Sequence, residues 1–242
     1  MTADAPVLLS ERTGEVLILV LNRPRAANAL DSSLHEALVA QLEAADADAD
    51  VRALVLGAVG ERSFSAGADL KEFGRLERSE ASRRRRALLL RTLIAVMDFG
   101  KPLVARVEGK ALGAGCMLAL LADEIVAGDE AQFGMPEILL GMPSPMGADV
   151  IAARAGSRLA RRLVQGGQPI GAREAHRQGL IDEVTEAPAL YRTSLERARA
   201  LARLAGSAYA GNKRWMNRTL RASLAAAAAE SERLQAAARS RD

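Results

Sequence analysis

The sequence predicts an α/β fold in which short strands and helices alternate and a helical region follows. Short apolar runs bounded by turn residues, such as Arg52–Ala58 and Leu103–Val107, are typical of buried strands. Stretches with helical spacing lie between these runs, and from Gly147 onward the pattern is almost wholly helical. The chain of 242 residues can bury a large core. No linker rich in Pro, Gly or Ser divides it.

The first elements follow from turn and cap signals. Val7–Glu11 and Val16–Leu21 flank the turn residues Thr13 and Gly14, which predicts a β-hairpin. Asp31 precedes a stretch with helical spacing and can cap its first turn. The apolar residues that set this spacing are Leu34, Leu38, Val39 and Leu42.

The middle of the chain twice shows the order strand, small-residue turn, helix. In the first case Arg52–Ala58 leads to the turn Phe64–Asp69, a helix that begins near Leu70, and a longer helix over Glu80–Phe99. The second case consists of the strand Leu103–Val107, the turn Gly113–Gly115 and the helix Cys116–Ala122, and strands at Glu124–Ala127 and Ile181–Val184 follow.

Composition favours a soluble, cytoplasmic protein with no nucleic-acid or membrane partner. The net charge is only +3, and almost no aromatic residues accompany the basic ones to stack on bases. The densest basic cluster, Arg83–Arg86, is interpreted as the solvated face of a helix rather than a phosphate site. The apolar run Ala111–Ala122 is too short to span a bilayer. The single cysteine, Cys116, fits a reducing compartment and excludes an internal disulfide.

Two turns and one carboxylate are the strongest candidates for chemistry. Backbone N–H groups at Ala66-Gly67 and at Gly113–Gly115 could converge on a developing negative oxygen, although such turns are often purely structural. Glu137 follows Pro136 at a helix start, where an acid is also favoured by the helix dipole. His35 and His176 are expected to lie on the surface. The few histidines and the cysteine show no metal-ligand spacing.

Four segments occur in an order that is typical of one enzyme family. They are Leu21–Pro24 with Asn28–Leu30 (LNRP and NAL), Phe64–Lys71 (FSAGADLK), Ala111–Cys116 (ALGAGC) and Ala131–Ile138 (AQFGMPEI). Together they resemble the crotonase superfamily of enoyl-CoA hydratases and isomerases, over about residues 14–185. The resemblance implies a spiral of ββα units with the CoA site in residues 1–185. It also implies a helical C-terminal region, residues 186–242, for packing into a homotrimer or homohexamer.

The resemblance implies an acyl-CoA substrate, no metal, and no cofactor beyond the coenzyme A of the substrate. It places the carboxylate at Glu137 and the two N–H donors to the thioester oxygen at Ala66 and Ala114. Asp69 can equally cap a helix, and Lys71 can equally be a solvent-facing residue. The positions implied to contact CoA or the acyl group are Arg25, Ala27, Ala68, Asp69, Leu70, Lys71, Gly113, Met117, Pro136 and Met142.

Met117 stands where typical hydratases of the family have a second glutamate. A methionine cannot hold or move a proton, whereas concerted addition of water is helped by two such groups. The sequence therefore favours isomerisation of an enoyl-CoA by Glu137 alone. Two alternatives stay open: a hydratase that uses Glu137 alone, and a non-catalytic acyl-CoA-binding protein. The loop Gly141–Ala148 also departs from the family pattern, and its methionines could form an apolar wall for the acyl chain.

Overall fold

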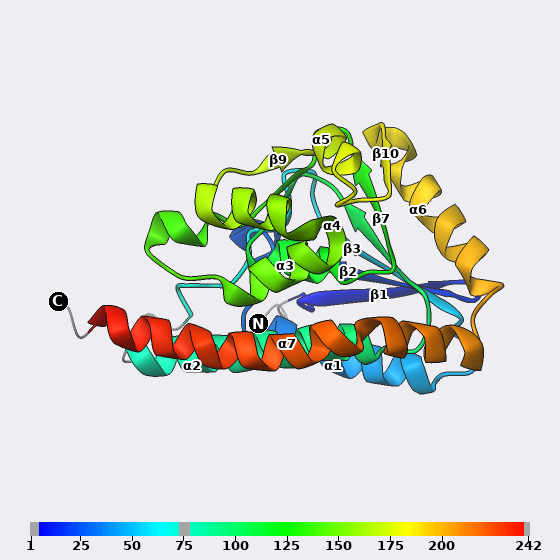
Figure 1. Ribbon diagram of the computed structural model, residues 1–242. Helices are drawn as coiled ribbons and strands as arrows, with labels where there is room; N and C mark the ends of the chain where they lie inside the picture. The colour runs from blue at the N-terminus through cyan, green and yellow to red at the C-terminus, as the bar shows by residue number, and fades with distance from the viewer. Residues whose placement is uncertain (1–4, 73–77, 240–242) are drawn as a thin grey trace.

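The computed structural model describes residues 5–72 and 78–239, which form alternating strands and helices (Figure 1). The chain begins with the predicted antiparallel hairpin, β1 (Leu8–Thr13) and β2 (Val16–Leu21). The first long helix, α1 (Ser32–Ala47), begins where the cap predicted it, because the Asp31 carboxylate accepts the Leu34 N–H at 2.8 Å. Both sequence-based predictions are confirmed.

A six-stranded sheet forms the centre of the fold, in the order β1-β2-β3-β5-β7-β10. From β2 onward, neighbouring strands are parallel. The added strands are β3 (Ala53–Ala58), β5 (Leu103–Val107), β7 (Glu124–Gly128) and β10 (Glu183–Thr185). The predicted strands are all present. β3, β5 and β7 are mostly buried, as strands covered on both faces are, whereas β10 is only partly buried and begins two residues later than predicted.

A second sheet, which the sequence did not predict, has four strands of two or three residues in the order β4-β6-β8-β9. Strands this short carry no readable alternation of apolar and polar residues. They are β4 (Ser63–Ser65), β6 (Lys110–Leu112), β8 (Gln132–Gly134) and β9 (Ile170–Gly171).

The two sheets together produce the predicted winding of ββα units. In each unit the first strand (β3, β5 or β7) joins the large sheet and the second (β4, β6 or β8) joins the small one. Helical structure follows each pair. The helical elements are α2 (Arg78–Asp98), α3 (Ala114–Leu120), α4 (Pro145–Gly166), α5 (Ala172–Arg177) and the 3-10 turns η1 (Pro24–Ala26) and η2 (Pro136–Leu140).

The helix expected to begin near Leu70 differs from the prediction. Leu70–Glu72 form a turn, in which Asp69 accepts the Lys71 and Glu72 N–H groups, and residues 73–77 lie outside the described part of the chain. α3 starts two residues earlier than predicted, directly after Gly113, whose φ of +53° redirects the chain into the helix.

The last two helices pack on the ββα units. α6 (Ala187–Ala202) covers one face of the large sheet, where Leu190 and Ala198 join the strand residues Val16 and Ile18 in a buried apolar cluster. α7 (Ser207–Arg239) runs alongside α2 and also contacts α4 (Figure 1). The division at residue 185 and the packing of these helices on another subunit stay predictions.

His35 is buried, so the expectation of a surface position was wrong. Only 4% of this residue is exposed, and its Nδ1 lies 2.7 Å from Thr92 Oγ1 of α2. Burial lowers the pKa of His35 to about 4, with the Asp31 carboxylate opposing the shift. The imidazole is therefore neutral near pH 7 and joins α1 to α2 through a hydrogen bond.

Candidate active site

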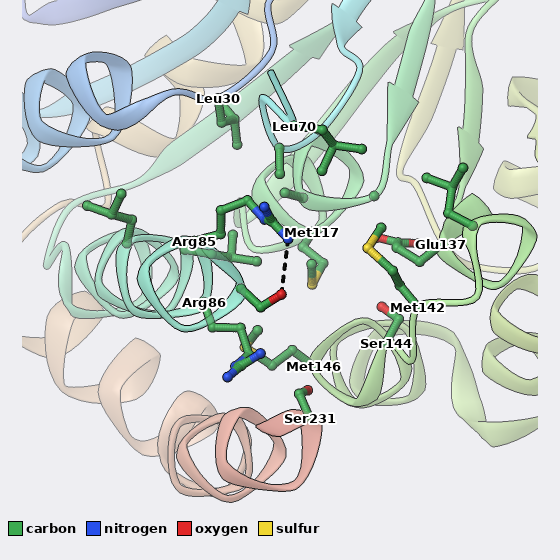
Figure 2. Close-up of a pocket in the computed structure, with 18 of the residues that line it drawn as sticks. Leu30, Leu70, Arg85, Arg86, Met117, Glu137, Met142, Ser144, Met146 and Ser231 are labelled. Atoms are coloured by element: carbon green, nitrogen blue, oxygen red, sulfur yellow. Dashed lines mark hydrogen bonds between the residues drawn. The ribbon is translucent and has the colours of Figure 1, made fainter. Parts of the chain in front are cut away.

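A pocket lies between the two small-residue turns and is closed by α2, η2, the start of α4 and Ser231 of α7 (Figure 2). It brings together residues that lie far apart in the sequence. The predicted site residues that line it are Ala66, Ala68, Leu70, Gly113, Ala114, Met117, Pro136, Glu137 and Met142.

The remaining predicted site residues lie outside the pocket lining. Arg25 and Lys71 are exposed, and Ala27 has a left-handed φ of +50° at the end of η1. Asp69 is held by Arg23 at 2.9 Å. Partial burial would raise the pKa of Asp69, but hydrogen bonds from Arg23 and two backbone N–H groups outweigh it and lower the pKa. Asp69 therefore fixes the turn as a carboxylate.

The first turn presents a different backbone donor from the one predicted. The Ala66 N–H already donates to the Ala27 carbonyl at 2.9 Å, so it is not available to a ligand. Leu30 bonds the residues on both sides of Ala68, accepting from Asp69 and donating to Gly67, in an isolated parallel bridge. In this pattern the N–H of Ala68 itself points away from Leu30. Since Ala68 lines the pocket, its N–H is the candidate donor of this turn.

The second turn lies directly against the first. Ala114 is the first residue of α3, so its N–H precedes the first intrahelical bond, which runs from Met117 N–H to the Gly113 carbonyl. A Cβ atom on Gly67 would lie 2.8 Å from Leu112 O and 3.3 Å from Ala114 N. Glycine at position 67 thus allows the two turns to approach, and the candidate donors of both turns line one pocket.

The carboxylate of Glu137 lies close to the second turn. A Cβ atom on Gly113 would lie 2.7 Å from Glu137 Oε1, so any side chain at Gly113 would displace this carboxylate. The other oxygen, Oε2, is buried and has no hydrogen-bond partner among the described residues. Burial raises the pKa of Glu137 above the ordinary carboxyl value. A raised carboxyl pKa beside a cavity suits a group that takes up and returns a proton.

Methionine side chains line the same pocket as this carboxylate. Met117 on α3 is 3% exposed and Met146 is 5% exposed, and both line the pocket. Met142 is half-buried and its N–H donates to the Glu137 carbonyl at 3.0 Å. Met142 and Met146 of the loop Gly141–Ala148 thus line the pocket, and their role as a wall for the acyl chain stays a prediction. Cys116 is fully buried and burial raises its pKa to about 12, so a reactive thiolate is not favoured there.

Three ionisable side chains of the pocket were not predicted from the sequence: His35, Arg85 and Arg86. Arg83 and Arg84 are exposed as expected, whereas Arg85 and Arg86 are partly buried and line the pocket (Figure 2). The signal that could have found these two arginines is helical spacing. They precede Leu89, another pocket residue, by four and three positions, which places all three on one face of α2.

Within residues 5–72 and 78–239, no three or more His, Cys, Asp or Glu side chains are grouped as a metal site would require. In the same part of the chain, no helix is long and apolar enough to cross a membrane.

The described residues form an α/β protein of ββα units, with candidate backbone donors and one carboxylate beside the same cavity. A family model described as enoyl-CoA hydratase/isomerase matches residues 11–242. The chain belongs to this family of the crotonase superfamily and is an enzyme of it. The resemblance inferred from the four motifs is therefore confirmed, together with the fold class.

Individual relatives support the same family assignment. The chain is 38% identical to 2,3-dehydroadipyl-CoA hydratase of Escherichia coli K12, over 94% of this chain and 88% of the relative. It is 40% identical to a probable enoyl-CoA hydratase of Rhizobium meliloti, over 90% and 84%. The crystal structure of a probable enoyl-CoA hydratase from Mycobacterium thermoresistibile superposes with a TM-score of 0.87 at 25% identity, covering 98% of this chain and 99% of that one.

Proposed function

We propose that this protein isomerises an enoyl-CoA thioester with Glu137 as its single proton carrier. The observation that carries the proposal is the make-up of the pocket. Among the described residues that line it, Glu137 is the only carboxylic acid, and Met117 occupies the position at which a second one would be expected. A single carboxylate is sufficient to move a proton between two carbons of the same substrate.

In this mechanism Glu137 removes a proton from C2, the carbon next to the thioester, and returns it to C4, the far carbon of the original C3–C4 double bond, so that the double bond moves to C2–C3. The thioester oxygen carries negative charge between the two steps. The N–H groups of Ala68 and Ala114 would donate to it and lower the barrier, as preorganised backbone donors do in a water-poor site. Ala68 replaces Ala66 in this role, because Ala66 donates to Ala27. The double bond moves by one position along the acyl chain, and the substrate gains and loses no atoms overall.

Hydration is the second candidate, because the relatives described above are named as hydratases. Glu137 would then have to deprotonate water and also protonate the substrate. Met117 gives no help with this, because a thioether neither holds a proton nor strongly orients water.

A non-catalytic binder of acyl-CoA is the third alternative. A buried carboxylate with a raised pKa argues against it, since such a group destabilises a fold that gains nothing from it.

The rest of the substrate and the assembly are part of the same proposal. Arg25, Ala27 and Lys71 are assigned to the CoA moiety, and no cofactor beyond CoA is required. A cytoplasmic homotrimer or homohexamer would cover large apolar side chains that the single chain leaves exposed. Leu139, Leu140, Trp215 and Met216 are each more than 60% exposed. Sedimentation at micromolar concentration should show an oligomer, and a stable monomer would contradict this assembly.

The test of function is a panel of 2-enoyl-CoA and 3-enoyl-CoA thioesters of several lengths. Mass spectrometry detects the addition of water, and NMR locates the double bond in products of unchanged mass. Isomerisation without water addition is the expected result. Rapid hydration of 2-enoyl-CoA would overturn the proposal in favour of the second candidate, and binding without any turnover would favour the third.

A further inference from the structure

Two arginines on α2 give the pocket a charged region apart from Glu137. Figure 2 shows Arg85 and Arg86 across the pocket from Glu137, with Met117 between them and Ser231 of α7 beyond. The Arg86 side chain is only 12% exposed. Most other side chains that line the cavity are apolar, including Leu30, Leu89 and Met146.

Both guanidinium groups are held in place by the protein. Arg85 Nη2 donates to Ser82 Oγ at 3.3 Å, which orients it along the pocket side of α2. Arg86 pairs with Glu232 of α7 at 3.7 Å, a distance longer than a direct hydrogen bond, and that carboxylate side chain is 54% exposed. Both cations therefore lie beside the cavity, and each has a partner in the protein.

A purely hydrocarbon acyl chain fits such a pocket poorly. Its end would place hydrocarbon against the cavity side of two guanidinium groups and remove the water there, which is unfavourable. A carboxylate offers the opposite charge and the planar geometry that a guanidinium binds with two parallel hydrogen bonds. The pKa of Arg85 is lowered by burial and by the neighbouring Arg86, and an anion placed beside both would offset this repulsion.

We propose that Arg85 and Arg86 bind a carboxylate at the far end of the acyl chain, so that the substrate is the CoA thioester of a dicarboxylic acid. This inference rests on the proposed function, since it names the substrate class of the same site. Anchoring the far end also fixes the reacting carbons between Glu137 and the donors at Ala68 and Ala114, which is the positioning that proton transfer needs.

An anion at these arginines could also be a phosphate of CoA itself, and the test separates the two sources. Calorimetry would compare unreactive saturated thioesters in pairs of equal length: succinyl-CoA with butyryl-CoA, glutaryl-CoA with pentanoyl-CoA, and adipyl-CoA with hexanoyl-CoA. Both members of a pair carry the same CoA. In at least one pair, the wild-type protein should bind the dicarboxylic member at least about tenfold more tightly, as expected of a charged hydrogen bond.

Arg85→Met and Arg86→Met should each abolish this preference while leaving the affinity for the uncharged member nearly unchanged. Arg83→Met, on the exposed side of the same helix, is the matched control and should keep the preference. Circular dichroism checks that each variant is folded, and the wild-type comparison alone tests the proposal if one is not.

Three results would overturn the inference. If the wild type binds the uncharged member of every pair as tightly as the dicarboxylic member, or more tightly, the pocket does not recognise a carboxylate at the far end of the acyl chain. If the arginine variants lose affinity equally for both thioesters of a pair, the arginines bind a phosphate of CoA instead. If no thioester binds at all, the proposed function itself fails, and the substrate class fails with it.

Discussion

The two ends of the pocket are built in different ways. At the reaction end, the candidate donors at Ala68 and Ala114 belong to the backbone, and the Glu137 carboxylate lies against Gly113, which has no side chain. At the other end, the lining includes polar side chains of two helices, Arg85 and Arg86 on α2 and Ser231 on α7. Backbone donors tolerate changes of side chain but not a shift of the chain, whereas the helix side chains can be exchanged one at a time. We therefore expect stabilisation of the thioester oxygen to depend on the course of the backbone, and the choice of acyl group to depend on side chains that can be exchanged.

Glu137→Gln should have the largest effect on this comparison. An amide keeps the size of the side chain but cannot accept a proton, so turnover should fall by roughly a hundredfold or more. Binding of a saturated acyl-CoA should be largely intact in calorimetry. Glu130→Gln, at an exposed position, is the control and should keep full activity. Full turnover by Glu137→Gln would remove the carboxylate from the mechanism.

Gly113→Ala tests whether the reaction end depends on the course of the backbone. The new Cβ would collide with Glu137 Oε1, and a misplacement of this kind can lower the rate by up to about a hundredfold. Gly14→Ala is the matched control, because its φ of +64° imposes similar backbone strain but nothing lies within 4 Å of the added atom. Both variants should lose stability in thermal unfolding, and only Gly113→Ala should lose turnover.

Met117→Glu is expected to sharpen the distinction between hydration and isomerisation. A second carboxylate could orient water, so the ratio of hydrated to isomerised product should rise. The gain should stay below the roughly hundredfold effect of a well-tuned group, because the buried surroundings of Met117 would raise the pKa of the new carboxyl and keep part of it protonated. Met117→Gln has the same shape without the charge and should leave the ratio unchanged. An equal rise in both variants would argue against a proton-transfer role.

The smallest effect concerns stability and pH. The pKa of Glu137 is raised in the folded protein above its ordinary value of 4.5, so the folded state holds this proton more tightly than the unfolded state. The contribution of Glu137 to stability is thus complete below pH 4.5 and is lost as the pH rises through the folded-state pKa. Glu137→Gln should raise the melting temperature at pH 7 by no more than a few degrees. This difference in melting temperature should vanish at acidic pH. A variant that is less stable than the wild type at pH 7 would contradict the assignment of a buried carboxyl group with a raised pKa.

The long elements were determined by the sequence alone. The apolar run Leu103–Val107 predicts a strand from its local composition. The helix after Asp31 is predicted by its apolar spacing and by a local capping hydrogen bond. Four motifs also marked Glu137 and the two turns as the site. These signals are short-range, so they can be read one segment at a time.

Only the tertiary structure decided which atoms of those segments face the pocket. Ala66 and Ala68 are the same residue type in one turn. The hydrogen bond from Ala66 to Ala27 and the bridge at Leu30 leave the Ala68 N–H as the candidate donor to the pocket. Arg85 and Arg86 belong to one basic run with Arg83, and their position beside the cavity follows from how α2 packs against α7 and α3. The burial of His35 has the same origin. Each outcome depends on contacts between segments far apart in the chain, which no local pattern records.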